Sequence, residues 1–369
     1  MQIKQFTATN IRSLDFVSLT PLDHVNIIIG KNNDGKTTLL ESLYFSSSLK
    51  SFRSVTSSSL IKNGQNSLNI LLNVSKSTEN LTISLEKKLK GANFSKINEK
   101  RCSAKDLFLS FPVLALNFGA ENIVTGSSDE RRSLLDWGTF HVEHKYLLVF
   151  KDYQKALKQR NSLLKKKSLD NLDYWTTTLA ELGETMNAYR ERYFHTLNDQ
   201  FVAYKKNILE IIPDAYDDIK NSALEYYRGW NKKETLYDAL NNSLEKDIML
   251  KHTTSGPHRC DMILSSNGYE LKNVSAMSTQ IITGLLLVLC QSRVFHVEHG
   301  HRPIILIDDL FFGIDDKNLT LVINLLKDSS AQCFITAPDL YRSKLDEVCM
   351  KDEKIRMYEF EDRKLMERK

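Results

Sequence analysis

The motif from which the rest of the sequence can be interpreted reads Gly30-Lys31-Asn32-Asn33-Asp34-Gly35-Lys36-Thr37. An apolar run over residues 25–29 precedes it and predicts a buried strand, and a periodic stretch over residues 37–45 follows it and predicts a helix. A strand, a Gly-x-x-x-x-Gly-Lys-Thr loop and a helix are together typical of a phosphate-binding loop. The glycines let backbone N–H groups approach phosphate oxygens, and the helix start adds its positive end. A glycine turn with a chance Gly-Lys-Thr is the competing interpretation, which these flanks disfavour.

Specific side chains of this loop have expected roles in binding ATP. Lys36 is expected to reach the β- and γ-phosphates and to act in catalysis, and the Thr37 hydroxyl is expected to ligate Mg²⁺. The predicted ATP-binding residues of the loop are Gly30, Lys31, Asn32, Asn33, Asp34, Gly35, Lys36, Thr37 and Thr38.

A second motif supplies the carboxylates that such a loop needs. Residues 303–307 predict a buried strand, and Asp308 and Asp309 follow it directly. Asp308 is expected to hold the Mg²⁺ with its water shell, and Asp309 to act as the general base toward the attacking water. Two acids at an ordinary strand end are the alternative, which the phosphate-binding loop disfavours.

The two motifs are far apart, since Asp308 stands 272 positions after Lys36. Between them, residues 131–206 are charged and periodic, which predicts two or three long helices. This is the layout of ABC-type and SMC-type ATPase heads, in which a helical arm interrupts one nucleotide-binding fold. We therefore predict an α/β ABC-type P-loop head. It has a β-rich ATPase lobe over residues 1–125, a helical arm domain over 126–249 and a second ATPase lobe over 250–369.

Composition indicates which cellular compartment the protein occupies and which kinds of partner it can bind. The five cysteines are odd in number and widely spread, which favours a reducing cytoplasm over a disulfide framework. No apolar run reaches the roughly 20 residues of a membrane span, and the first residues lack the pattern of a signal peptide. The net charge of +4 permits nucleic-acid binding without requiring it.

Several segments resemble the RecF family, the bacterial recombination-mediator ATPases of the SMC/Rad50-like group. The resemblance covers nearly the whole chain, and its segments are Asn10-Ile11-Arg12-Ser13, Ser51-Phe52-Arg53-Ser54, Arg131-Arg132-Ser133-Leu134-Leu135-Asp136-Trp137-Gly138, Leu157-Lys158-Gln159-Arg160-Asn161, Arg228-Gly229-Trp230, Thr254-Ser255-Gly256-Pro257-His258-Arg259-Cys260-Asp261 and Leu306-Ile307-Asp308-Asp309. The resemblance adds Arg12 to the expected ATP-binding residues. It implies ATP-dependent binding to DNA near single-strand gaps, ATP-dependent homodimers, and help for RecO and RecR in loading RecA. These activities belong to DNA recombination, replication, repair and the SOS response.

The sequence departs from the family pattern at the loop that touches the partner's γ-phosphate in a dimer. The family has a Leu-Ser-x-Gly-Gln signature there, whereas this chain reads Met277-Ser278-Thr279-Gln280, without the glycine. Ser278 can still donate its hydroxyl. Gly313 stands where the family often has an acid, and Asn117 falls near the expected Q-loop glutamine.

A cluster of basic residues lies on one predicted helix. Between residues 151 and 167 there are seven basic residues and one acid. Sequence-independent contact with DNA phosphates is the interpretation that the resemblance favours, and a solvated helix face is the alternative. The predicted DNA contacts are Lys151, Lys155, Lys158, Arg160 and Lys165.

Histidines raise two further questions. Phe-His-Val-Glu-His occurs at residues 140–144 and 295–299, where a zinc site competes with ordinary packing, which we favour. His258 is expected to face a nucleotide, DNA or the arm, or to be a satisfied histidine in a turn.

Three functions are consistent with these features. The first is an ATP-dependent recombination mediator that hydrolyses ATP slowly. The second is a degenerate head that binds ATP and a protein partner with little hydrolysis. The altered loop at Ser278 favours this function. The third is the ATPase part of a nuclease of the overcoming-lysogenisation-defect group, which needs a Toprim-like acidic domain after the head, whereas the sequence stops at Lys369.

Overall fold

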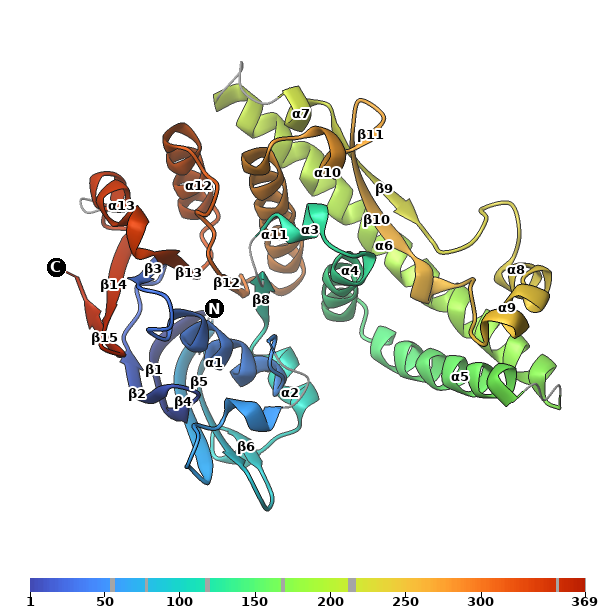
Figure 1. Cartoon of the computed structure of the whole chain (residues 1–369), viewed down its shortest axis with the longest axis horizontal. Coiled ribbons are helices and arrows are strands. Elements are labelled where there is room, and N and C mark those ends of the chain that lie inside the picture. The colour runs from blue at the N-terminus through green and yellow to red at the C-terminus, as the bar shows by residue number, and fades with distance from the viewer. Residues whose placement is uncertain are drawn as a thin grey trace. The chain divides into compact units, whose positions relative to one another are not determined.

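The computed structural model (Figure 1) describes residues 1–53, 57–76, 79–116, 120–166, 170–211, 217–349 and 352–368. The chain divides into two compact units: unit 1 is Met1–Asn122 with Gln280–Lys369, and unit 2 is Ile123–Thr279. The first boundary lies close to the expected position at residue 125. Residues 250–279, however, belong to unit 2 and not to the second ATPase lobe. Strand pairing explains this difference, because β10 (Asp261–Ser266) runs antiparallel to β9 (Ser222–Tyr227).

Unit 1 contains two six-stranded sheets within the described residues. The first is antiparallel, in the order β2-β1-β4-β5-β6-β7, with β1 (Gln2–Ile11), β2 (Leu14–Leu19), β4 (Ser67–Lys76), β5 (Glu79–Lys88), β6 (Phe94–Ile97) and β7 (Lys100–Arg101). The second has the order β15-β14-β3-β13-β12-β8, with β3 (Val25–Gly30), β8 (Val113–Leu116), β12 (Ile304–Ile307), β13 (Cys333–Pro338), β14 (Ile355–Glu361) and β15 (Lys364–Glu367). Its strands are parallel except for β15, which forms a hairpin with β14.

Helix α1 (Lys36–Ser48) contacts strands of both sheets. Its Leu39 and Leu43 share one core with Ile28 of β3 and with Ile70 of β4. Every residue of β3 is buried, as expected for a parallel strand covered on both faces. Strand β4 instead alternates between buried and more exposed positions, as a strand with one covered face does. The loop between β3 and α1 therefore joins two elements that the core holds firmly.

The remaining helices of unit 1 are α2 (Ala104–Ser110), most of α11 (Met277–His299), α12 (Asp316–Asp328) and α13 (Arg342–Cys349). By length and composition α11 is apolar enough to cross a membrane, although the sequence predicted no such stretch. However, 83% of its most apolar window is buried inside the protein. Leu285 and Leu289, for example, are fully buried. We therefore assign α11 as a core helix.

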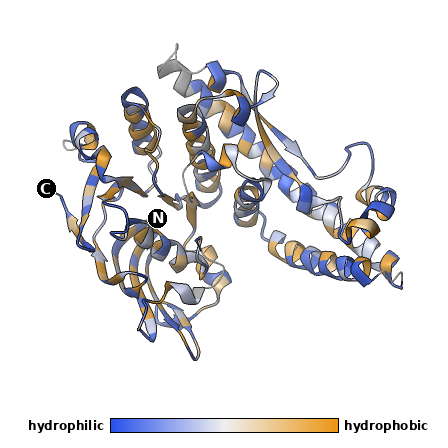
Figure 2. Ribbon diagram, in the orientation of Figure 1, coloured by the Kyte–Doolittle hydropathy of each residue, from blue (hydrophilic) through white to orange (hydrophobic). Residues whose placement is uncertain are grey.

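Unit 2 is mainly helical. Its long helices are α4 (Ser128–Val142), α5 (Tyr146–Lys166) and α6 (Leu172–Ile211), in agreement with the two or three long helices expected. The sheet β11-β10-β9, with β11 (Tyr269–Glu270), and the short helices α7 (Asp217–Lys220), α8 (Leu236–Asn242), α9 (Leu244–Leu250) and α10 (Leu271–Val274) complete it; α3 (Asn122–Thr125) spans the boundary. Figure 2 shows hydrophobic and hydrophilic residues alternating along α5, which matches its one buried face.

Segments that resemble RecF meet inside unit 2. A Cβ atom at Gly138 of α4 would lie 2.0 Å from the hydroxyl of Tyr193 on α6, so a larger residue there would displace the Tyr193 ring. Gly229 has a φ of +101°, and a Cβ there would lie 2.1 Å from the carbonyl oxygen of Gly256. The segments of Gly229 and Gly256 therefore pack closely against each other within unit 2.

Candidate nucleotide-binding site

The phosphate-binding loop runs from the end of β3 to the start of α1. Gly35 has a φ of +116°, and a Cβ atom there would lie 2.7 Å from Leu14, so the position requires glycine. Asn33 also has a positive φ, of 70°. The carboxylate of Asp34 accepts a hydrogen bond from the backbone N–H of Lys31 at 2.8 Å, which braces the loop from within. Asp34 and Lys31 therefore shape the loop.

Lys36 is folded back onto its own loop. Its Nζ donates hydrogen bonds to the carbonyl oxygens of Gly30 at 2.7 Å and Lys31 at 2.9 Å. The side chain is only 6% exposed. Burial lowers the pKa of Lys36, and the carboxylate of Asp309 is the strongest of the groups that oppose this shift. The ammonium group is thus held at the mouth of the loop, where a phosphate oxygen can replace its two carbonyl acceptors.

The second motif meets the loop directly. The Thr37 hydroxyl donates to Oδ1 of Asp308 at 3.1 Å, and the Thr336 hydroxyl donates to the same oxygen at 2.6 Å. Asp308 is 5% exposed, and burial raises its pKa while the bond from Thr336 opposes that rise. A hydroxyl and a carboxylate side by side suit Mg²⁺, which takes one or two protein ligands together with phosphates and waters.

Asp309 differs from its neighbour in exposure and backbone conformation. Its φ is +50°, and its backbone N–H donates to the Thr336 hydroxyl at 2.8 Å. Its side chain is exposed and lines a pocket of about 690 Å³ together with loop residues. The Thr336 hydroxyl of β13 therefore contacts both aspartates, Asp308 through its carboxylate and Asp309 through its backbone N–H.

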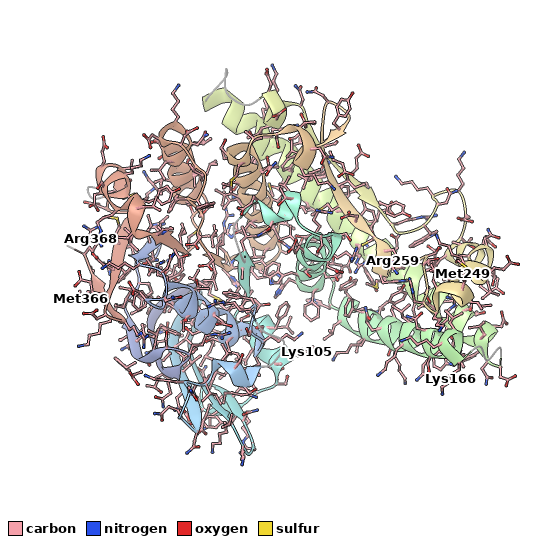
Figure 3. The ribbon with its side chains drawn as sticks, viewed as in Figure 1. Lys105, Lys166, Met249, Arg259, Met366 and Arg368 are labelled. Carbon is pink, nitrogen blue, oxygen red and sulfur yellow. The ribbon has the colours of Figure 1, made fainter. Side chains whose placement is uncertain are left out.

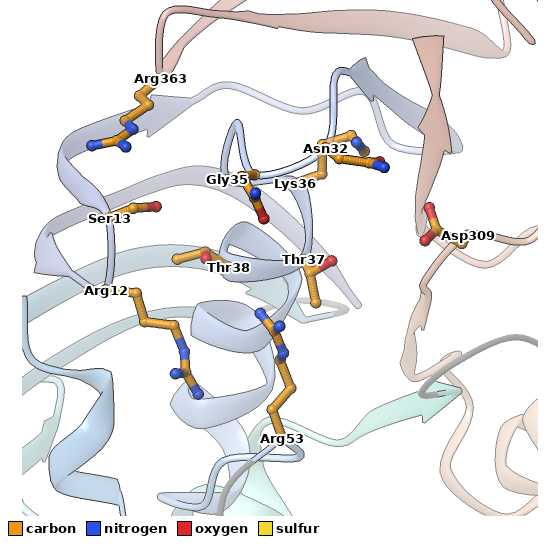
Figure 4. A pocket seen from close by; sticks show the side chains of 11 residues that line it. Arg12, Ser13, Asn32, Gly35, Lys36, Thr37, Thr38, Arg53, Asp309 and Arg363 are labelled. Atoms are coloured by element: carbon orange, nitrogen blue, oxygen red, sulfur yellow. The ribbon is translucent and has the colours of Figure 1, made fainter. Parts of the chain in front are cut away.

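The pocket gathers most of the predicted ATP-binding residues (Figure 4). It is lined by Arg12, Ser13, Asn32, Asn33, Gly35, Lys36, Thr37, Thr38, Arg53, Asp309 and Arg363. Gly30, Lys31, Asp34 and Asp308 do not line it. Arg12 is held by a buried partner, because its Nε and second terminal nitrogen bond the carboxylate of Glu41 at 2.5 and 2.7 Å. Glu41 lies on α1 and is fully buried.

Three pocket residues were not predicted from the sequence, namely Ser13, Arg53 and Arg363. Ser13 and Arg53 each lie within a segment that resembles RecF, so that resemblance was the available signal. Arg363 had no such signal. It stands 327 positions after Lys36 and reaches the pocket only because β14 pairs with β3, with Phe360 opposite Gly30.

The predicted DNA contacts require one correction. Lys151, Lys155, Lys158 and Lys165 of α5 are exposed, and Figure 3 shows the adjacent Lys166 at the C-terminal end of this helix. Arg160 is fully buried. It donates to Asp247 at 2.7 Å and to Thr253 at 2.8 Å, and Asp247 is also fully buried. Arg160 forms this internal ion pair and is not accessible to a DNA phosphate, so its prediction as a DNA contact was wrong.

His258 faces the arm. Its Nδ1 lies 2.7 Å from the Tyr153 hydroxyl of α5, and its Nε2 lies 3.0 Å from the carbonyl oxygen of Thr253. The carbonyl can only accept, so Nε2 carries the proton and Nδ1 accepts from Tyr153. Burial lowers the pKa of His258 to about 4.

Other predicted features have simpler surroundings. Ser278 is the second residue of α11, belongs to unit 2 and is half-buried. Asn117 lies outside the described residues. His141 is buried, with its ring 4.2 Å from that of Trp137. The described residues contain no group of three metal-ligating side chains.

Comparisons with known proteins agree with this architecture. The family model described as RecF/RecN/SMC N terminal domain matches residues 2–362. The DNA replication and repair protein RecF of Stutzerimonas stutzeri (strain A1501) is 30% identical over 343 residues, which cover 92% of this chain and 90% of that protein. RecF of Francisella tularensis subsp. tularensis (strain WY96-3418) is 29% identical over 355 residues, which cover 94% and 97%.

Solved structures show the same likeness. The recombination mediator protein RecF-ATP in the RecFOR pathway superimposes with a TM-score of 0.78 at 26% identity, and 99% of both chains is covered. An SMC head bound to the C-winged helix domain of ScpA shares the fold, with a TM-score of 0.59 at 13% identity over 100% of this chain and 98% of that one. The fold is therefore an ABC-type ATPase head with an inserted helical unit, as the sequence predicted. By its family model, its relatives and its fold, this chain belongs to the RecF family within the RecF/RecN/SMC group.

Proposed function

We propose that this chain is an ATP-dependent, DNA-binding recombination mediator that hydrolyses ATP slowly. One observation carries the proposal: Lys36 and Thr37 of the phosphate-binding loop meet Asp308 and Asp309 at one edge of the sheet, in a chain of the RecF family. The likeness to a RecF-ATP structure supports ATP as the nucleotide.

Each residue has a role in this proposal. Lys36 neutralises the β- and γ-phosphates, and Thr37 with Asp308 would hold Mg²⁺, which supplies positive charge at the phosphates. Asp309 is exposed in the pocket and takes the proton of the attacking water as general base. In a dimer, Ser278 of one protomer would approach the γ-phosphate bound by its partner.

The DNA-binding part of the proposal uses unit 2. Lys151, Lys155 and Lys158 are exposed on α5, opposite its buried face. Contacts from such a stripe go to phosphates and are independent of sequence. Single-strand gaps as the DNA target, RecO and RecR as partners and RecA loading are further parts of the proposal. Membership of the RecF family supports these three expectations. The similar RecF-ATP structure is also described as part of the RecFOR pathway.

The test measures ATP affinity and DNA affinity separately. Lys36→Ala should abolish ATP binding in calorimetry, and Lys105→Ala, an exposed lysine of α2 seen in Figure 3, is the control. A triple Lys→Gln variant at residues 151, 155 and 158 should weaken gapped-DNA binding and flatten its salt dependence. The same change at the exposed residues 90, 100 and 105 removes equal charge as a control. Unchanged ATP affinity in Lys36→Ala would refute the nucleotide site, and equal DNA binding by the two triple variants would refute the lysine stripe.

A degenerate head is the second candidate, because the Ser278 loop lacks the glycine expected before Gln280. Sedimentation with and without ATP and gapped DNA separates the two. We expect an active recombination mediator to dimerise when it binds ATP. A degenerate head would bind ATP but stay monomeric.

A further inference from the structure

A residue from the far end of the chain lines the nucleotide pocket. Strands β14 and β15 pair from Glu361 to Lys364, so that Asp362 and Arg363 alone form the turn. Their φ values are +45° and +64°. A two-residue hairpin turn with both φ values positive normally takes Asn-Gly or Asp-Gly, because a side chain at the second position is strained. The chain therefore presents an arginine at a position where glycine would be more stable.

The surrounding residues define which end of the pocket Arg363 occupies. Lys36, Thr37 and Asp309 mark the end that receives the β- and γ-phosphates. Figure 4 shows Asp309 on one side of the loop, and Thr38, Ser13 and Arg363 on the other. A triphosphate that extends from Asp309 past the start of α1 therefore directs its nucleoside toward Ser13 and Arg363.

The pocket offers few groups that can contact a base. None of the described residues that line it is aromatic. Of its three arginines, Arg12 is bound to Glu41. Arg53 lines the same pocket as Thr37, and its charge lowers the pKa of Asp308, so we assign it to the phosphate end. Arg363 is exposed and forms no hydrogen bond or ion pair within the described part of the chain.

We propose that Arg363 is a specificity residue that stacks its guanidinium plane on the purine ring of the bound nucleotide. A planar, weakly hydrated guanidinium stacks on aromatic rings, which suits a pocket whose walls are otherwise polar. This inference rests on the proposed ATP binding. It assigns to the β14–β15 hairpin the recognition of the nucleoside, and to the loop of β3 and α1 the recognition of the phosphates.

The test compares ligands with and without a nucleoside. The variant is Arg363→Gly, because glycine suits the turn and the melting temperature should stay equal or rise. Calorimetry would measure the Kd of ATP, ADP and tripolyphosphate, with Arg101→Gly on the exposed β7 as the control. We expect ATP and ADP to bind about three- to tenfold more weakly and tripolyphosphate to bind as it does to the wild type.

Two results would overturn the proposal. Unchanged ATP affinity in Arg363→Gly would show that the guanidinium makes no contact, and an equal loss for tripolyphosphate would show that it contacts phosphate. Failure of the wild-type protein to bind ATP at all would instead refute the proposed function, so the two failures are distinguishable. Arg363→Lys should not restore the affinity, because an ammonium group has no plane to stack.

Discussion

The Thr37 hydroxyl donates a hydrogen bond to Oδ1 of Asp308 over 3.1 Å, although the two residues are 271 positions apart in the chain. The same carboxylate oxygen accepts from Thr336 of the neighbouring parallel strand. Three segments thus meet at the carboxyl edge of one sheet, which is where α/β folds bind ligands. This geometry allows the roles of the two adjacent carboxylates to be separated by mutation.

The first prediction concerns Asp309. Asp309→Asn should retain ATP affinity, because Lys36 and the loop are untouched, but it should slow single-turnover hydrolysis by at least about a hundredfold. The control Asp328→Asn changes an exposed acid at the end of α12 and should leave the rate unaltered. Hydrolysis at the wild-type rate by Asp309→Asn would exclude Asp309 as the general base.

The second prediction concerns the buried pair of Arg160 and Asp247. Arg160→Ala leaves a carboxylate with no cationic partner at a fully buried site, which typically costs about 3–5 kcal/mol of the free energy of unfolding. Urea denaturation measures the loss. Lys158→Ala, two residues away on the exposed face, should change the free energy of unfolding by less than about 0.5 kcal/mol. Equal stability of both variants would show that the ion pair is not formed in solution.

The third prediction concerns pH. Burial holds the pKa of His258 at about 4, below the ordinary value of 6.5, so the unfolded chain binds this proton more readily than the folded one. The contribution of neutral His258 to the free energy of unfolding is therefore fully present above about pH 6.5. It is lost as the pH falls from 6.5 toward 4. Between pH 7 and pH 5 this group should remove on the order of 2 kcal/mol from the free energy of unfolding.

The matched variant for this measurement is His258→Gln, which does not titrate and whose amide can contact Thr253 and Tyr153. Its stability should depend less on pH than that of the wild type over this interval. If the two proteins show the same slope of unfolding free energy against pH, then His258 is not buried in its neutral form.

Several parts of the fold follow from local patterns. The run before Gly30, the helix after Lys36 and the strand before Asp308 were predicted because each has the periodicity of its element. The helical unit was expected from its charged, periodic sequence. The limits of this unit were harder to predict, because β10 has the sequence of an ordinary strand and only its pairing with β9 places it in unit 2.

Arg160 shows why charge alone misleads. It follows Tyr153 and Ala156 and precedes Leu164 at helical spacing, and all four residues are buried. The periodicity therefore placed Arg160 on the core face of α5. Its partner Asp247 lies 87 positions away, so no local pattern showed that a buried charge would be neutralised there.

The sequence by itself determined the phosphate-binding loop, its distant carboxylates and the family, because these depend on short motifs whose chemistry is read in order along the chain. Only the tertiary structure decided which residues outside these motifs line the nucleotide pocket. Arg363 reaches the pocket because β14 pairs with β3 in a register that places Phe360 opposite Gly30. Such a register is set by packing between distant strands, and no local pattern specifies it.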